Sequence, residues 1–320
     1  MLSRKNSLIF FFLLMKGIFL FADEESILDY SIITFFGIKN GSVNELVYEN
    51  ENQISKLVWD QSMSPQFGID INFKIWRFFI KTQQINSIPI KSGYLEDFDY
   101  LTSNANEISH YSKHDSYLDK DFSANAQISF KIKVNKKYYD IYPLIGVTYQ
   151  NRKWSAQDGF LQYPLIEGNP WTGNEPKQSL TGTVISYEQS LWYPYFGLEN
   201  IVHINSSLFL GILAFYYPYV SIDSLDSHFL RSKQFYDIMR DGSGVKIEGW
   251  LVIMPFKTQK SVGIKIAANY ENFSSYGNSS TNNIGINNNK FIQSDIVSSG
   301  TKSTLFSYSL GFIFNPTIWD

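Results

Sequence analysis

The sequence contains no cysteine among its 320 residues. This absence excludes disulfides, thiolate metal sites and cysteine nucleophiles together, and it suits an oxidising compartment, where a free thiol would be a liability. The His-Glu-x-x-His pattern of zinc peptidases is also missing. The sequence therefore predicts neither a metal nor another protein-bound cofactor.

An excess of positive charge is absent as well. The chain carries 27 basic and 30 acidic residues, which gives a net charge of −3. Its basic residues are interleaved with aromatic residues and do not gather in one patch, as they do in proteins that bind a phosphate backbone. We therefore expect no nucleic-acid partner.

Long hydrophobic runs are confined to the N-terminus. Residues 1–22 combine a basic start at Arg4 and Lys5 with two apolar runs separated by Lys16. These runs are shorter than the roughly 20 apolar residues that a spanning helix needs, so they predict a signal peptide cleaved near Ala22, with an uncleaved anchor as the alternative. Residues 23–320 then form one domain, which can cross a membrane only as a closed barrel.

Apolar and polar residues alternate with period two along the mature chain. The pattern is clearest at residues 67–75, 124–134, 262–270 and 306–314. Each run gives a strand one apolar and one polar face, as in a soluble sandwich or in a membrane barrel. The runs of about ten residues, the aromatic content of 17% and the asymmetry of the connections favour the barrel.

The connections predict which end of the barrel faces outward. Short turns are expected at one end and long polar loops at the other, so the strand count is ten, with both termini on the short-turn side. The fold class is therefore all-β, a ten-stranded antiparallel transmembrane β-barrel with long extracellular loops. The expected turns are residues 62–65, 135–137, 200–206 and 256–260, and the expected loops are residues 39–53, 83–121, 155–181, 223–243 and 276–303.

Two short polar clusters follow predicted strands. Asp226 and His228 are separated by one residue, and so are Asp97 and Asp99. Residues i and i+2 share a face at a strand end, so each pair can point into one groove. An imidazole that titrates near neutral pH and is oriented by a carboxylate is a suitable general base for activating water. The alternative is that all four are solvated loop residues.

Five separated segments resemble the omptin family of outer-membrane endopeptidases, which are ten-stranded barrels with an active site at the outer rim. They occur in the family's order between about residues 28 and 314. The segments are Gly-Ser-Val-Asn-Glu-Leu-Val-Tyr with the following Ser-Lys-Leu-Val-Trp (residues 41–48 and 55–59), Glu-Asp-Phe-Asp-Tyr (96–100), Ser-Lys-His (112–114), Ser-Tyr-Glu-Gln-Ser-Leu-Trp-Tyr-Pro-Tyr-Phe-Gly-Leu (186–198) and Asp-Ser-His (226–228).

The resemblance implies a role for each matching residue. His228 would be the general base and Asp226 its orienting partner, while Asp97 and Asp99 would hold the nucleophilic water. Omptins favour basic residues beside the cleaved bond, through a first-loop Glu and an Asp two residues before the Asp-x-His motif. In this chain Glu45 matches the first position, but Ser224 occupies the second with Asp223 beside it. His114 matches a position that lines the groove.

The family's lipid A contacts are only partly retained. Tyr149, Lys153 and Arg240 match aromatic and basic positions, but Asn151 replaces an acidic residue and Ser190 a basic one. A requirement for lipopolysaccharide is therefore open. The resemblance implies a monomer in the bacterial outer membrane, with its active site facing the exterior and a peptide or protein as substrate. The alternatives are an inactive omptin-like barrel that acts as an adhesin or receptor, and a small structural porin.

Overall fold

The fold, seen in a computed structural model, is all-β. The structure describes residues 29–75, 77–102, 104, 107–132, 138–255, 262–283 and 292–315, with the side chains of 292–296 left aside. Within these ranges no helix is long and apolar enough to cross a membrane. The strands are β1 (Asp29–Glu49), β2 (Asn52–Ile75), β3 (Phe78–Ser87), β4 (Ile90–Asp99), β5 (His110–Phe130), β6 (Tyr139–Gln162), β7 (Gln178–Ser179), β8 (Thr183–Asn205), β9 (Leu208–Tyr217), β10 (Ser221–His228), β11 (Lys233–Ile253), β12 (Val262–Asn283) and β13 (Ile292–Phe314).

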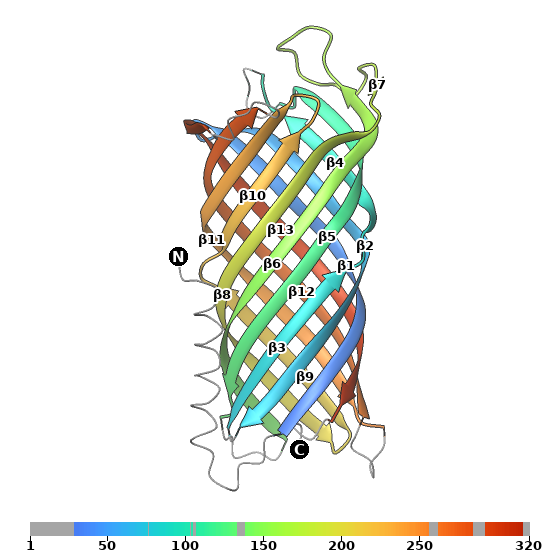
Figure 1. Cartoon of the computed structure of the whole chain (residues 1–320), viewed down its shortest axis with the longest axis vertical. Coiled ribbons are helices and arrows are strands. Elements are labelled where there is room, and N and C mark those ends of the chain that lie inside the picture. The colour runs from blue at the N-terminus through green and yellow to red at the C-terminus, as the bar shows by residue number, and fades with distance from the viewer. Residues whose placement is uncertain are drawn as a thin grey trace.

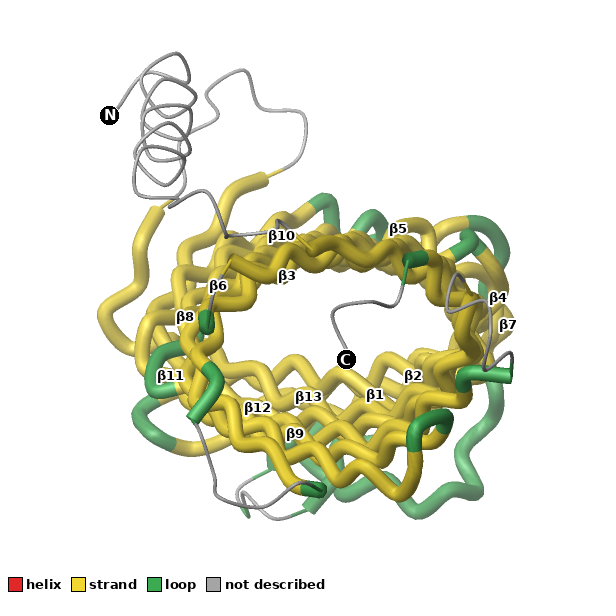
Figure 2. The backbone as a smooth tube through the Cα atoms, turned by 90° about the horizontal axis from the view of Figure 1, so that it is seen from below, coloured by secondary structure: helices red, strands yellow, loops and turns green. Residues whose placement is uncertain are grey.

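The strands form a closed antiparallel circuit in which β13 pairs with β1. Strand β2 pairs with β3 over its lower half and with β4 over its upper half, and β9 and β10 likewise share one place beside β8 and β11. The described ladders therefore define ten places around the ring, the expected number. Figure 1 shows β4 and β10 at the upper end of the cylinder, and Figure 2 shows that the ring is flattened.

The two faces of each strand explain the period-two pattern. On β1 and β13, Ile33 and Ile313 are buried inside the ring, whereas Phe36 and Leu310 are exposed on its outer surface. Outward apolar side chains of this kind surround the lower part of the barrel, as expected for a surface that contacts hydrocarbon. Above this apolar belt the outer surface carries charged pairs, such as Lys91 with Asp115, whose Nζ and Oδ2 atoms are 2.7 Å apart.

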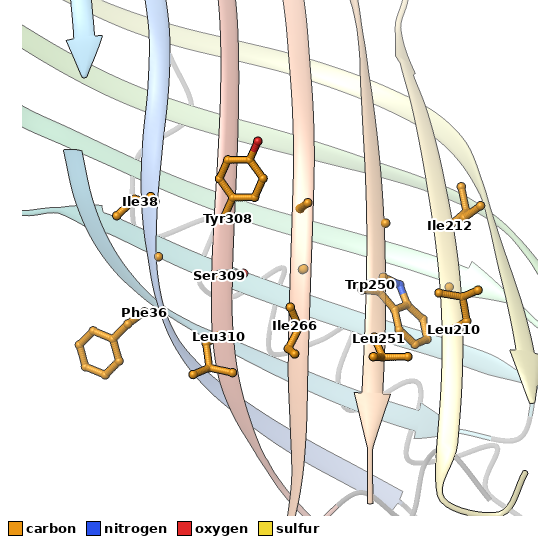
Figure 3. A pocket seen from close by; sticks show the side chains of 15 residues that line it. Phe36, Ile38, Leu210, Ile212, Trp250, Leu251, Ile266, Tyr308, Ser309 and Leu310 are labelled. Carbon is orange, nitrogen blue, oxygen red and sulfur yellow. The ribbon is translucent and has the colours of Figure 1, made fainter. Parts of the chain in front are cut away.

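The apolar belt has a shallow depression of about 830 Å3 on the outer face of β1, β9, β11, β12 and β13 (Figure 3). Its floor is the cross-strand pair of Gly249, which has no side chain, and Ala268, which has only a methyl group. Ile212 and Tyr308 pair with these two residues on either side and form its walls. The depression lies on the outer surface.

Charged side chains cross the lumen. Arg152 is completely buried, and its guanidinium lies 3.6 Å from both Asp121 and Glu271. Lys39 also reaches Asp121, with 2.6 Å between Nζ and Oδ2. The described luminal cavities measure only about 30 and 60 Å3. Buried charges are tolerated here because each has an opposite charge nearby.

Several predicted connections were wrong. Residues 39–53, 83–121 and 223–243 are largely strand, so they extend the barrel above the apolar belt. The loop predicted at residues 155–181 is confirmed over residues 163–177, which connect β6 to β7. Residues 62–65 lie inside β2 and form no turn. The serine and proline residues that suggested a turn belong instead to a β-bulge. The pairing of β2 with β1 shifts between Lys39 and Gly41, and Met63 has a positive φ of 47°. The expected signal peptide and the turns at residues 135–137 and 256–260 lie outside the described residues.

Candidate active site

The imidazole of His228 and the carboxylate of Asp226 lie on the inner face of β10. Their spacing of two residues directs both side chains to the same side of the strand, and Nε2 of His228 contacts Oδ2 of Asp226 within hydrogen-bonding distance. Asp226 is buried. The ring of Phe235 packs edge-on against the imidazole, with the ring centroids 5.4 Å apart. The strand and this aromatic contact hold the imidazole in place against its carboxylate.

Asp97 and Asp99 lie at the end of β4, on the other side of the mouth of the barrel. Burial and the neighbouring carboxylate of Asp99 raise the pKa of Asp97 to about 7, although the positive charges of His228 and Arg231 oppose the shift. The Ser55 hydroxyl donates a hydrogen bond to Oδ1 of Asp97 over 3.4 Å. Asp97 is therefore partly protonated near neutral pH.

The two clusters are close enough to influence each other's titration. Burial disfavours the imidazolium form of His228, but Asp226 and Asp97 both stabilise that charge, and the net result is a raised pKa. The structure thus brings the four predicted catalytic residues together. They come from the third and seventh places of the ring, as the strand count predicts.

This coupling gives a first prediction. We expect Asp97→Asn to lower the pKa of His228, because it removes a negative charge that stabilises the imidazolium. The imidazole proton shift, followed by NMR against pH, should have its midpoint at a lower pH than in the wild type. Asp115→Asn, on the outer surface beside Lys91, is the matched control and should leave the midpoint in place. An unchanged midpoint in Asp97→Asn would show that the two clusters do not interact.

A second carboxylate pair lies deeper in the barrel. Glu45 on β1 is buried, and no described residue forms a hydrogen bond with its Oε2 atom. Asp237 on β11 is also buried and accepts a hydrogen bond from the Ser224 hydroxyl over 3.0 Å. Ser224 and Asp237 are direct cross-strand partners. Asp237 therefore places a carboxylate beside Ser224, at the position where the family resemblance predicts one.

Burial and neighbouring negative charges raise the pKa of both carboxyls. For Glu45, burial has the largest effect, followed by the charges of Asp226, Asp237 and Asp97. For Asp237, burial raises the pKa to about 6, aided by the charge of Asp226 and opposed by hydrogen bonds from Ser279 and Ser224. An acidic pocket made by Glu45 and Asp237 is suited to a positively charged guest, which would remove the repulsion.

The pocket carries a cost in stability, which gives a second prediction. Because the folded pKa of Glu45 lies above its unfolded value, ionisation of Glu45 destabilises the fold at pH values above the folded pKa, whereas below the unfolded value the penalty is absent. We expect Glu45→Gln to raise the thermal midpoint by roughly 2 to 4 °C at pH 8 and to change it little at pH 4. An equal shift at both pH values in a heat-modifiability assay would contradict this origin.

A stack of buried aromatic rings supports the site from below. Tyr187 is the cross-strand neighbour of Asp226, and its ring stacks at 6.0 Å on Trp59 and at 6.2 Å on Trp154. The Tyr187 hydroxyl receives a 2.8 Å hydrogen bond from Gln189. All three rings are completely buried, so they form a rigid aromatic core next to the carboxylates.

Two predicted substrate-binding residues lie away from this pocket. His114 is buried on β5, and its ring nitrogens contact the Asp158 carbonyl at 2.6 Å and the Ser112 hydroxyl at 2.9 Å. Burial lowers the pKa of His114, so the neutral ring links neighbouring segments by hydrogen bonds. Asp223 is on the outer face of β10, where its Oδ1 lies 2.5 Å from Nη2 of Arg240.

The expected lipid-contact residues lie on the outer surface of β6 and β11. Tyr149 is exposed, and Lys153 lies 3.9 Å from Glu188. Arg240 pairs with Asp223. Each cation therefore has a carboxylate of this chain beside it. A lipid phosphate would have to compete with that carboxylate for the cation.

A comparison with known protein families settles the classification. A sequence model of the Omptin family matches residues 27–315. The chain belongs to the omptin family. Omptins are bacterial outer-membrane barrels, so the apolar belt is the membrane-facing surface of this chain. The site described above lies beyond that belt.

A solved protease structure has the same fold as this chain. The outer membrane protease OmpT from Escherichia coli superposes with a TM-score of 0.80 at 18% identity, covering 89% of this chain and 96% of that one. The translocator domain of the autotransporter NalP from Neisseria meningitidis reaches a TM-score of only 0.34 at 9% identity, covering 92% of each chain. A comparison with curated proteins found no match.

Asp237 is the site residue of this omptin that sequence reasoning missed. It lies inside a segment predicted to be a polar loop, eleven residues from Asp226 along the chain. The signal that identifies it is the hairpin register, since a four-residue turn after His228 aligns Ser224 with Asp237. Without the length of that turn, the cross-strand partner of Ser224 is undefined.

Proposed function

We propose that this omptin is an outer-membrane endopeptidase that hydrolyses peptide bonds with a water molecule activated by His228. The observation that carries the proposal is the contact between His228 and the buried Asp226 on the inner face of β10, opposite Asp97. The same arrangement on solvated loops would leave the carboxylates exposed. The groove is at the end of the barrel from which β4 and β10 extend beyond the apolar belt, and we propose that it faces the cell exterior (Figure 1).

The chemistry assigns one role to each group. His228 accepts a proton as the water oxygen attacks the substrate carbonyl, and Asp226 stabilises the imidazolium that forms. The proton then passes from His228 to the amide nitrogen as the carbon–nitrogen bond breaks. Asp97 and Asp99 position the water, and Asp97 can donate a hydrogen bond because its pKa of about 7 keeps it partly protonated.

The acidic pocket supports a preference for basic substrates. Glu45 and Asp237 are two buried carboxylates whose mutual repulsion a Lys or Arg side chain would relieve. A guanidinium can also donate hydrogen bonds to both, including the unpartnered Oε2 of Glu45. We propose that this pocket, with Asp237 in place of the carboxylate missing at Ser224, binds a basic residue beside the cleaved bond.

The test is cleavage of a quenched fluorescent peptide library by the refolded protein, with and without lipopolysaccharide, beside the His228→Ala and Asp226→Asn variants. Cleavage that both substitutions abolish supports the proposal. If a correctly folded barrel cleaves no peptide with or without lipopolysaccharide, an adhesin or receptor is favoured. Steady single-channel conductance without cleavage would instead support a porin.

A further inference from the structure

Arg231 connects the two catalytic clusters at the mouth of the barrel. It lies in the turn between β10 and β11, and its Nη2 is 3.8 Å from Oδ2 of Asp99 on β4. A hydrogen bond with Tyr163, from the segment after β6, also holds the guanidinium. The Arg231 side chain is 53% exposed, whereas that of Asp99 is only 13% exposed. The cation therefore reaches from the His228 side of the groove to the Asp99 side.

The hairpin places this cation and the acidic pocket on opposite sides of the catalytic pair. Along β10, Ser224 and its partner Asp237 lie below Asp226, towards the interior, and Arg231 lies in the turn beyond His228. A substrate chain lying past His228 thus has negative charge below it and a positive charge above it.

Successive side chains of an extended peptide point in opposite directions. If the residue on one side of the scissile bond enters the pocket of Glu45 and Asp237, the residue on the other side points towards the mouth. We propose that Arg231 is a specificity-determining residue that selects against Lys and Arg at this second position. The inference rests on the proposed peptidase function and adds that the two sides of the scissile bond have different side-chain preferences.

The physical reason is that Asp99 already has a cation. A basic substrate side chain near Asp99 would meet the guanidinium of Arg231 and would have to displace it, while a neutral or acidic side chain meets no such repulsion. Because Arg231 is half exposed, its pairing is weak and screened, so the discrimination should be modest and should fall with salt.

The test uses two peptides with Arg in the pocket position, one with Lys and one with Ala after the scissile bond. We expect the wild type to prefer Ala, and Arg231→Gln to shift the ratio of kcat/KM towards Lys by roughly fivefold at low salt. Arg231→Lys should keep much of the wild-type preference. Lys233→Gln, a cation at the base of the same turn, is the matched control and should leave the ratio unchanged.

Binding separates this inference from the proposed function. Fluorescence anisotropy of both peptides on the His228→Ala variant, with and without Arg231→Gln, gives the same ratio without any cleavage. A shift in binding, together with a wild-type barrel that cleaves neither peptide, supports the role of Arg231 and contradicts the peptidase function. Equal affinities for Lys and Ala peptides, or a ratio that Arg231→Gln and salt leave unchanged, would overturn the inference.

Discussion

Replacing His228 by alanine is expected to lower kcat for peptide cleavage by about a thousandfold, because the attacking water loses its general base. The barrel should remain folded, since the ladders that pair β10 with β8 and β11 do not depend on the imidazole. KM should change little, because the acidic pocket is intact. Steady-state kinetics with a quenched peptide measures both quantities, and heat-modifiability on gels verifies the fold.

Asp226→Asn tests whether the imidazole and its carboxylate act as a unit. An asparagine keeps the shape of the side chain but removes the charge that stabilises the imidazolium. The double variant with His228→Ala should therefore be hardly slower than His228→Ala alone, because groups that act together show strongly non-additive losses. Independent, multiplying losses would contradict the shared role. Activity retained in His228→Ala would place the base elsewhere.

The period-two pattern made the lower barrel predictable, since it is set by a lipid-facing surface on one side and a polar lumen on the other. The pairing of Asp97 with Asp99 and of Asp226 with His228 could also be predicted, because residues i and i+2 share a face of a strand. Their joint position follows from the order of places in the ring, which the strand count supplied.

The upper barrel was harder to predict because its strands have no consistently apolar face. Within residues 223–243 the buried side chains include Asp226 and Asp237, whereas Ile238 is exposed, so no regular alternation marks the segment as strand. The error at residues 62–65 had the opposite direction, because residues typical of a turn lie there in a β-bulge within a continuous strand. Cross-strand partners such as Ser224 and Asp237 depend on turn lengths, which composition does not give.

Asp237→Asn is expected to lower kcat/KM for a peptide with Arg beside the cleaved bond by about thirtyfold, because a buried guanidinium loses one of its two carboxylate partners. The effect should be measured at pH 8, well above the pKa of about 6 for Asp237, where the carboxylate is ionised. A peptide with a neutral residue at that position should lose far less, so the ratio of the two rates reports on the pocket and not on folding.

Moving the carboxylate across the hairpin gives the decisive control. Ser224 and Asp237 face each other directly, and directly opposed residues in an antiparallel pair are only about 5 Å apart. The exchange Ser224→Asp with Asp237→Ser should therefore restore most of the preference for Arg. Ser224→Asp alone adds a third carboxylate beside Glu45 and should raise the pKa values in the pocket further, to the detriment of stability. If Asp237→Asn keeps the full preference for Arg, or if the exchange fails to restore it in a folded barrel, the basic side chain is bound elsewhere in the groove.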